Sequence, residues 1–195
     1  MTIVYIHGAS ATSESFARIR EHVKKLDLCI EYNSSVGFEN NLRNMINLVE
    51  PLEKVFFVAH SLGGIYAMHL ADRFPNKILG AVTLSTPYGG SREADFARYF
   101  LPFSQLMRDI GTMSSPMSKI PNLQYPKKHW TNVVTTQGSS PWIKQANDGV
   151  VTIQSMRAIE DMDLVELQLN HYEVVISDKT IEIIKDRLAR TPLGP

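Results

Sequence analysis

The segment 55–67, which reads VFFVAHSLGGIYA, constrains the fold more than any other part of the chain. It opens with an apolar run, Val55–Val58, whose β-branched and aromatic side chains predict a buried strand. After Ser61 the apolar spacing becomes helical and ends near Pro75. A strand that enters a helix through a sharp turn with a serine at its apex is a nucleophile elbow. We therefore expect the Ser61 hydroxyl to be exposed at the carboxyl end of a strand.

Small residues flank the serine of such a turn because the strand and the helix pass close to each other there. Ala59 and Gly63 stand two residues before and two residues after Ser61. Glycine is usual at both places, and the alanine adds only one methyl group. The backbone N–H of Leu62, at the start of the predicted helix, is free to bind a developing oxyanion. The segment thus predicts a nucleophile and one half of an oxyanion hole.

Apolar runs alternate with helical patterns along the rest of the chain. Runs typical of strands lie at 3–6, 28–32, 55–58, 78–84, 133–136 and 164–169. Helical spacing of apolar residues occurs at 16–26, 38–49, 62–74 and 181–188. This alternation predicts βαβ units and a mainly parallel sheet of about six strands. The length of 195 residues suits one domain, spanning 1–195, and is short for two.

One long segment, between Gly90 and Trp130, interrupts the alternation. It is too long for a plain loop, and its phenylalanines and methionines are broken up by Pro102, Pro116 and Pro121. We expect short amphipathic helices over the carboxyl ends of the strands. Two interpretations stay open: a helical cap or lid at 90–129 that forms an apolar acyl pocket, and an ordinary excursion that completes the core.

Charge and composition narrow the classes of partner and location. The chain has 20 basic and 20 acidic residues and no basic block, which argues against nucleic acid as a partner. No apolar run approaches the roughly 18 residues that span a bilayer, so we expect no stable membrane insertion. The only cysteine, Cys29, lies in an apolar run and is expected in the core. With no signal peptide at the start, these features favour a cytoplasmic protein, with a secreted mature form as the alternative.

A serine hydroxyl is a weak nucleophile, so it needs a base and an acid that orients the base. His171 is the candidate base because it follows the last predicted strand, at the edge where open parallel sheets place their sites. A solvated loop histidine is the alternative interpretation. The remaining histidines fall within predicted helices, beside the motifs or before a strand; they are His7, His22, His60, His69 and His129.

Asp148 is the candidate acid, because it follows the strand at 133–136 after a loop. Its Asp-Gly sequence is also simply a good turn, which is the alternative interpretation. Asp161 and Asp163 compete for the role, but they precede the last strand and so lie at the opposite edge of the sheet. The resulting order of serine, aspartate and histidine along the chain is the one that accompanies a nucleophile elbow.

The loop after the first strand, His7-Gly8-Ala9-Ser10, is the expected source of the second oxyanion donor. Ala9 is the candidate donor through its backbone N–H. Gly8 lets the backbone turn close to a substrate. We interpret His7 as a hydrogen-bonded support rather than a second base, and His60 as a residue that packs beside the elbow.

With these motifs the chain resembles the α/β-hydrolase superfamily, and within it small bacterial lipases and lipase-like esterases. The matching segments are 7–8, 59–64, 84–87, 89–91, 147–151 and 170–171. The resemblance covers nearly the whole chain except 90–130, and alanine also occurs at the first elbow position of some small lipases. It implies a three-layer fold with helices on both faces of a minimal sheet, because the chain starts at what would be the family's third strand.

The resemblance implies a carboxylic-ester hydrolase that forms an acyl-enzyme on Ser61 and releases it with water activated by His171. Its substrate would be a small lipid-like or acyl ester. Two alternatives stay open: an acyltransferase or thioesterase with the same triad, and an inactive binding protein on the same fold. We expect no cofactor and, because no residues have hard-cation spacing, no metal. Transient contact with a lipid interface and the oligomeric state also stay open.

Overall fold

The computed structural model describes residues 1–91, 109–112 and 114–192. Part of the cap predicted at 90–129, namely 92–108 and 113, lies outside the described residues. The cap therefore stays a prediction.

Six strands form one sheet in which every neighbouring pair is parallel. The order across the sheet is β2-β1-β3-β4-β5-β6. The bounds of the strands are β1 Thr2–Ile6, β2 Asp27–Ile30, β3 Val55–His60, β4 Ile78–Leu84, β5 Trp130–Thr135 and β6 Asp163–Leu167. The expected parallel sheet is confirmed, and within the described residues it has no antiparallel pair.

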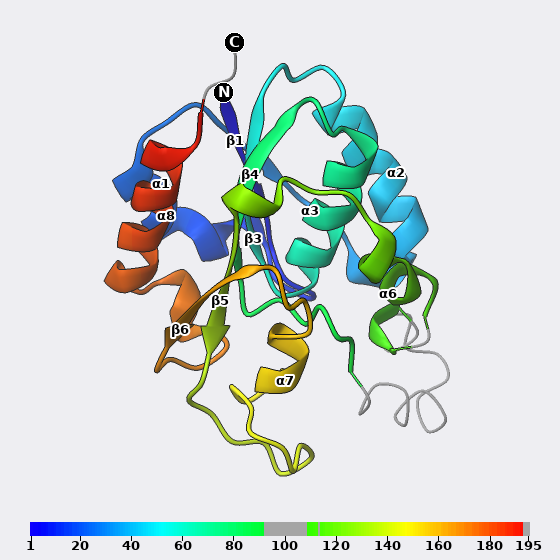
Figure 1. Ribbon diagram of the computed structural model, residues 1–195, viewed down its shortest axis with the longest axis vertical. Coiled ribbons are helices and arrows are strands. Elements are labelled where there is room, and N and C mark those ends of the chain that lie inside the picture. The colour runs from blue at the N-terminus through cyan, green and yellow to red at the C-terminus, as the bar shows by residue number, and fades with distance from the viewer. Residues whose placement is uncertain (92–108, 113, 193–195) are drawn as a thin grey trace.

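Helices cover both faces of this sheet, with α2 and α3 on one side and α1 and α8 on the other (Figure 1). The bounds of the α-helices are α1 Ala17–Val23, α2 Phe38–Val49, α3 Leu62–Arg73, α6 Ser115–Lys119, α7 Ile153–Met156 and α8 Asp178–Arg190. Short 3-10 helices lie at Ser13–Phe16, Ser34–Val36, Ile120–Asn122, Lys127–His129 and Glu173–Val175. This is the expected three-layer arrangement.

Each central strand contributes to two hydrophobic cores, because neighbouring side chains of a strand point to opposite faces. In β3, Phe57 packs into the cluster that holds Ile65 of α3, whereas Phe56 packs into the cluster that holds Ile184 of α8. All six residues of β3 are buried. Burial on both faces explains why this strand is a continuous apolar run rather than an alternating one.

Two details differ from the sequence-based expectation. The helix expected at 16–26 stops at Val23, because Lys24 takes a left-handed backbone with φ 48°. Leu26, expected on its buried side, is 72% exposed. Cys29, expected in the core, is only half-buried, because β2 is an edge strand.

The strand order reverses at β1, since the chain goes from β1 to β2 on one side and then to β3 on the other. The register pairs Ile6 with Ala59, so the loops that leave β1 and β3 start side by side. Open parallel sheets bind ligands beyond the carboxyl ends of their strands, at such a switch point. The elbow thus lies where the fold favours a site.

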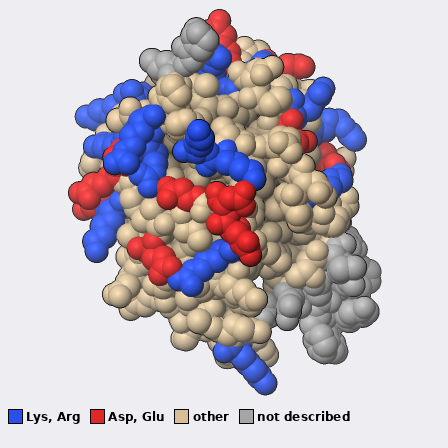
Figure 2. All heavy atoms as spheres, viewed as in Figure 1, with Lys and Arg blue, Asp and Glu red and all other residues tan. Residues whose placement is uncertain are grey.

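The surface carries no large region of one charge on the face shown in Figure 2, where basic and acidic side chains are interspersed. Several of them form exposed ion pairs, including Arg18 with Asp178 at 2.7 Å and Lys127 with Asp161 at 2.5 Å. Such pairs contribute about 0–1 kcal/mol each, so they matter more for solubility than for stability. Among the described helices, none combines the length and the apolar character needed to cross a bilayer.

Candidate active site

Ser61 occupies the sharp turn between β3 and α3, as the sequence predicts. Its backbone has φ 52° and ψ −122°, a combination that a residue with a side chain rarely adopts. The Ser61 N–H donates to the Leu84 carbonyl at 2.8 Å, and the Ser61 carbonyl accepts from the Gly64 N–H at 3.0 Å. Strain of this kind persists only where the surroundings fix the backbone, and it clusters at functional sites.

Two glycines explain how the turn is fixed. A Cβ at Gly63 would overlap the Ile6 carbonyl oxygen and lie 2.7 Å from the His7 carbonyl oxygen. A Cβ at Gly64 would overlap the side chain of Thr86. The small residue at position 63 is therefore required by the end of β1, and not by the strand that precedes the serine.

The loop after β1 lies against the elbow. A Cβ at Gly8 would lie 3.3 Å from the Ser61 Cβ and 2.9 Å from His60 Nδ1. Tyr32 holds the loop: its hydroxyl donates to the His7 carbonyl at 2.9 Å, and its ring stacks on the His7 ring at 4.4 Å. Ala9, the predicted donor, is half-buried in the same loop. Leu62 is the first residue of α3, so its N–H has no partner within the helix. The oxyanion role of the Leu62 and Ala9 N–H groups stays a prediction.

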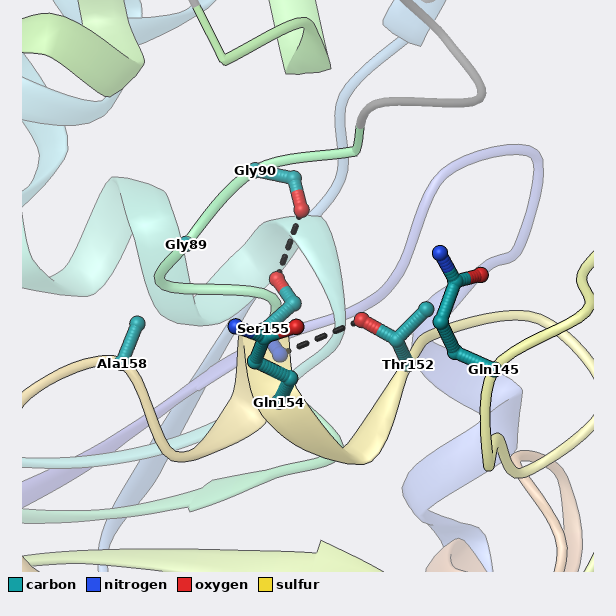
Figure 3. A pocket seen from close by; sticks show the side chains of 7 residues that line it. All are labelled: Gly89, Gly90, Gln145, Thr152, Gln154, Ser155 and Ala158. Carbon is teal, nitrogen blue, oxygen red and sulfur yellow. Dashed lines mark hydrogen bonds between the residues drawn. The ribbon is translucent and has the colours of Figure 1, made fainter.

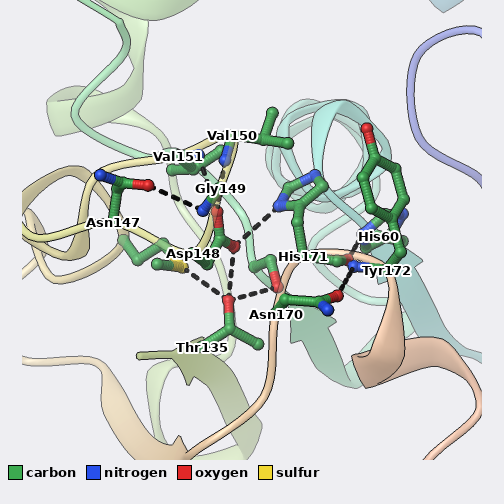
Figure 4. Close-up of polar contacts among 12 residues, drawn as sticks. His60, Thr135, Asn147, Asp148, Gly149, Val150, Val151, Asn170, His171 and Tyr172 are labelled. Carbon is green, nitrogen blue, oxygen red and sulfur yellow. Dashed lines mark hydrogen bonds and ion pairs between the residues drawn. The ribbon is translucent and has the colours of Figure 1, made fainter. Parts of the chain in front are cut away.

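His171 and Asp148 come together from segments that follow β6 and β5 (Figure 4). His171 Nδ1 donates to Asp148 Oδ2 at 2.8 Å, and both side chains are almost fully buried. Asp148 Oδ1 accepts the N–H groups of Val150 at 3.0 Å and Val151 at 2.7 Å. The Asp-Gly turn and the contact with the histidine therefore coexist, although the sequence presented them as alternatives.

The carboxyl of Asp148 stays ionised despite its burial. Burial raises its pKa, but the hydrogen bonds from His171, Thr135 and Val151 and the charge of His171 outweigh this, so the pKa of Asp148 is lower than usual. An ionised carboxylate accepts the Nδ1–H of His171 and leaves the other ring nitrogen, Nε2, free to take a proton.

His60 connects this pair to the elbow. Its Nε2–H donates to the His171 carbonyl at 2.9 Å, and the two ring centroids are 4.7 Å apart. Burial, together with the neighbouring His171 ring, lowers the pKa of His60 to about 3, so the ring is neutral. Because His60 directly precedes Ser61, the His171 ring lies beside the nucleophile turn. Within the described residues, no hydrogen bond joins Ser61 to His171; such bonds often tighten only when substrate binds.

The competing acids and histidines have other partners. Asp161 pairs with Lys127 at 2.5 Å, and Asp163 pairs with Arg187 at 2.8 Å, both near the amino end of β6. His69 donates from α3 to the Pro116 carbonyl at 3.0 Å. His22 lies exposed on α1, and His129 lies in the 3-10 helix before β5.

Sequence analysis missed Thr135, whose hydroxyl donates to Asp148 Oδ2 at 2.5 Å. A signal was present, because Thr135 is a polar residue at the carboxyl end of β5, the edge of the sheet where the site was expected.

Two pockets border the segment that follows β4, and neither is lined by Ser61, Asp148 or His171. The smaller, of about 210 Å³, lies beside the segments that follow β4 and β5 (Figure 3); it is lined by Gly89, Gly90, Gln145, Thr152, Gln154, Ser155 and Ala158. The larger, of about 420 Å³, has an apolar part formed by Tyr88, Met117 and Ile120 and an acidic part formed by Glu160 and Asp161. Among the described residues, no group of histidine, cysteine and acidic side chains is arranged to hold a metal ion.

Comparison with known proteins agrees with this architecture. A family model described as alpha/beta hydrolase fold matches residues 50–109, which include the elbow. No curated protein matches the chain significantly.

Solved structures match over nearly the full length. A Bacillus licheniformis lipase in its mature form is 16% identical with a TM-score of 0.69, covering 96% of this chain and 91% of the lipase. A lipase-esterase related protein from Clostridium acetobutylicum is 11% identical with a TM-score of 0.66, covering 95% and 93%. A carboxylesterase from Nitrososphaera gargenis is 14% identical with a TM-score of 0.61, covering 96% and 89%. Such low identities establish the fold alone. The chain therefore has the alpha/beta hydrolase fold, and lipases and esterases of low sequence identity are among its structural neighbours.

Proposed function

We propose that the protein is a serine hydrolase that cleaves carboxylic esters through an acyl-enzyme on Ser61. The observation that carries this proposal is the buried hydrogen bond between His171 and Asp148, with the histidine ring beside the strained serine turn. A serine, a base and an acid in these positions are the components that acyl transfer requires.

In the proposed reaction, Ser61 Oγ attacks the carbonyl carbon of the ester while His171 Nε2 takes the hydroxyl proton. The carbonyl oxygen becomes an oxyanion and is bound by the N–H groups of Leu62 and Ala9. Collapse of this intermediate breaks the bond to the alcohol, which leaves with the proton from His171. A water molecule, deprotonated by His171, then releases the carboxylic acid and restores Ser61. Asp148 keeps the histidine ring in the required orientation throughout.

The substrate class is proposed from the structural neighbours. They bear the names lipase and carboxylesterase, which supports an ester with a lipid-like or simple acyl group. The predicted cap at 90–129 would form the acyl site.

A fluorophosphonate probe that reacts with activated serines tests the nucleophile. We expect labelling of the wild-type protein and none of Ser61→Ala. Ser35→Ala is the matched control, because this exposed serine in the 3-10 helix Ser34–Val36 should not affect labelling. Absence of labelling in well-folded wild-type protein would contradict the proposal and favour a binding protein on the same fold.

A series of p-nitrophenyl esters of increasing chain length, assayed with and without lipid vesicles, tests the substrate class. We expect hydrolysis with a maximum at one range of chain lengths. Product analysis with an added alcohol or thiol separates hydrolysis from acyl transfer, since a transferase would form the new ester or thioester in preference to the free acid.

A further inference from the structure

Three buried groups form a chain of hydrogen bonds that ends on the proposed catalytic acid. Ser85 Oγ lies 2.8 Å from Thr135 Oγ1, which lies 2.5 Å from Asp148 Oδ2. Ser85 and Thr135 are completely buried, and Asp148 is almost so. The three residues follow or end different strands, Ser85 after β4, Thr135 at the end of β5 and Asp148 in the next loop. Figure 4 shows the Thr135 hydroxyl pointing at the carboxylate.

We propose that Ser85 and Thr135 are positioning residues, which hold the Asp148 carboxylate in the one orientation that lets it orient His171. This inference rests on the proposed function, because it assigns the two hydroxyls a part in that reaction.

The direction of each hydrogen bond follows from the number of protons available. An ionised carboxylate can only accept, so Thr135 donates its single hydroxyl proton to Asp148. The sulfur of Met156, 3.5 Å from the same hydroxyl, is a weak acceptor and does not compete. With its proton committed, Thr135 can only accept from Ser85. The hydrogen bonds therefore run from Ser85 through Thr135 to Asp148.

The geometry of the Asp148 carboxylate shows what this series of hydrogen bonds does. Asp148 Oδ1 is held by the Val150 and Val151 N–H groups, whereas Oδ2 receives both His171 and Thr135. Without the Thr135 hydroxyl, Oδ2 would have the His171 ring as its single hydrogen-bond partner among the described residues. Thr135 thus fixes the oxygen on which the orientation of the base depends.

The backbone of Ser85 gives independent support. Its φ is 51°, in the left-handed region that favours glycine, and its N–H donates to the Val133 carbonyl at 2.9 Å. A glycine would remove this strain, yet the chain has a serine whose hydroxyl contacts Thr135. Retained strain at a buried polar residue is typical of functional sites.

The test compares Thr135→Val, which keeps the shape of the side chain and removes the hydroxyl, with Thr135→Ser, which keeps the hydroxyl. We expect Thr135→Val to lower kcat about 10- to 100-fold with little change in KM, because a hydrogen bond to a charged group is lost. Thr135→Ser should restore most of the activity. Ser85→Ala should lower kcat less, and should cause no further loss when added to Thr135→Val, since its effect passes through Thr135.

Thr131→Val is the matched control. Thr131 is a buried threonine at the other end of β5, and its hydroxyl likewise donates to a carboxylate, that of Asp163, at 2.7 Å. It should change stability as much as Thr135→Val does while leaving kcat unchanged. Equal kcat for wild type and Thr135→Val would overturn the proposal, as would equal losses in Thr131→Val and Thr135→Val.

A second readout is independent of the reaction. We expect the proton between His171 Nδ1 and Asp148 to give a downfield resonance in proton NMR, and Asp148→Asn, which removes the carboxylate, serves to assign it. We expect the resonance to shift in Thr135→Val and Ser85→Ala and to stay in place in Thr131→Val. If the wild-type protein hydrolyses nothing but the resonance shifts as expected, the proposed function fails while the positioning geometry holds; an unshifted resonance in both Ser85→Ala and Thr135→Val would refute the geometry itself.

Discussion

The turns that carry Ser61 and Asp148 differ in the space beside them and in how the side chain is held. After Ser61, Gly63 leaves no space for a methyl group beside Ile6 and His7. The Asp148 main chain is also closely packed on one side, since a Cβ at Gly138 would overlap its carbonyl carbon, but a Cβ at Gly149 would meet no atom within 4 Å. The Asp148 carboxylate is held in addition by hydrogen bonds from four donors.

The contrast shows why the two sides of the site should respond differently to substitution. Steric fixation tolerates no added atom but does not depend on polar partners. At the Asp148 turn, volume can be added at Gly149 but not at Gly138, and the carboxylate depends on its hydrogen-bond donors. The predictions below test this difference, beginning with the largest effect.

Removal of the reacting groups tests whether the two sides work as one unit. Ser61→Ala and His171→Ala should each lower kcat/KM by about three orders of magnitude or more, and the double variant should lose little more than either. Asp148→Asn should cost less than either single change. Steady-state hydrolysis of a p-nitrophenyl ester measures these losses, and independent, multiplying losses would show that the residues do not share a mechanism.

Gly63→Ala should damage the folded state itself. The new methyl group would overlap a backbone carbonyl of β1, which cannot rotate away, so the free energy of unfolding should fall by about 3 kcal/mol or more. Urea unfolding followed by circular dichroism measures the change. A variant as stable as the wild type would mean that β1 and α3 are not closely packed.

His60 should make the protein sensitive to acid. Burial lowers the pKa of His60 to about 3 in the folded state. In the unfolded chain the same side chain has its ordinary pKa of 6.5 and takes up a proton below that pH. Stability is therefore complete above pH 6.5 and is lost as the pH falls toward 3. Between pH 7 and 4.5 the free energy of unfolding should fall by about 2–3 kcal/mol, because each unit of pKa difference corresponds to roughly 1 kcal/mol or a little more.

Urea unfolding at several pH values checks this prediction. His60→Gln should flatten the pH dependence over that interval, whereas His22→Gln, at an exposed position of α1, should leave it unchanged. Identical pH profiles for His60→Gln and the wild type would show that His60 accepts a proton without unfolding.

Gly149→Ala should have the smallest effect. Gly149 has φ +101° but open space around it, so alanine would cost only the backbone strain, about 1 kcal/mol. The same urea experiment applies. A loss as large as that of Gly63→Ala would remove the distinction between the two sides of the site.

The parts that sequence could predict are those set by local pattern. The strand, turn and glycines of the elbow are consecutive residues, and the parallel sheet follows from the alternation of short apolar runs with helical spacing. Asp148 and His171 were placed at the correct edge because each follows a strand.

Other features depend on how distant strands align. Ser85 meets Thr135 because β4 and β5 are neighbours in register, a contact across 50 positions that no local pattern encodes. The early end of α1 was not predicted, for another reason. Lys24 adopts a left-handed backbone that usually requires glycine, so the sequence held no stop signal there.

The strand order also has a consequence for synthesis. From β3 onward, each new strand is added to the same side of the sheet, and β6, which leads to His171, is the outermost. In a chain made from its amino terminus, Ser61 emerges about 110 residues before His171, or roughly 10 s earlier at about 10 residues per second. The Ser61 turn can thus form on the ribosome well before the proposed base is made, and if the proposed function is right, a nascent chain carries the serine in an unreactive state until the last strand docks.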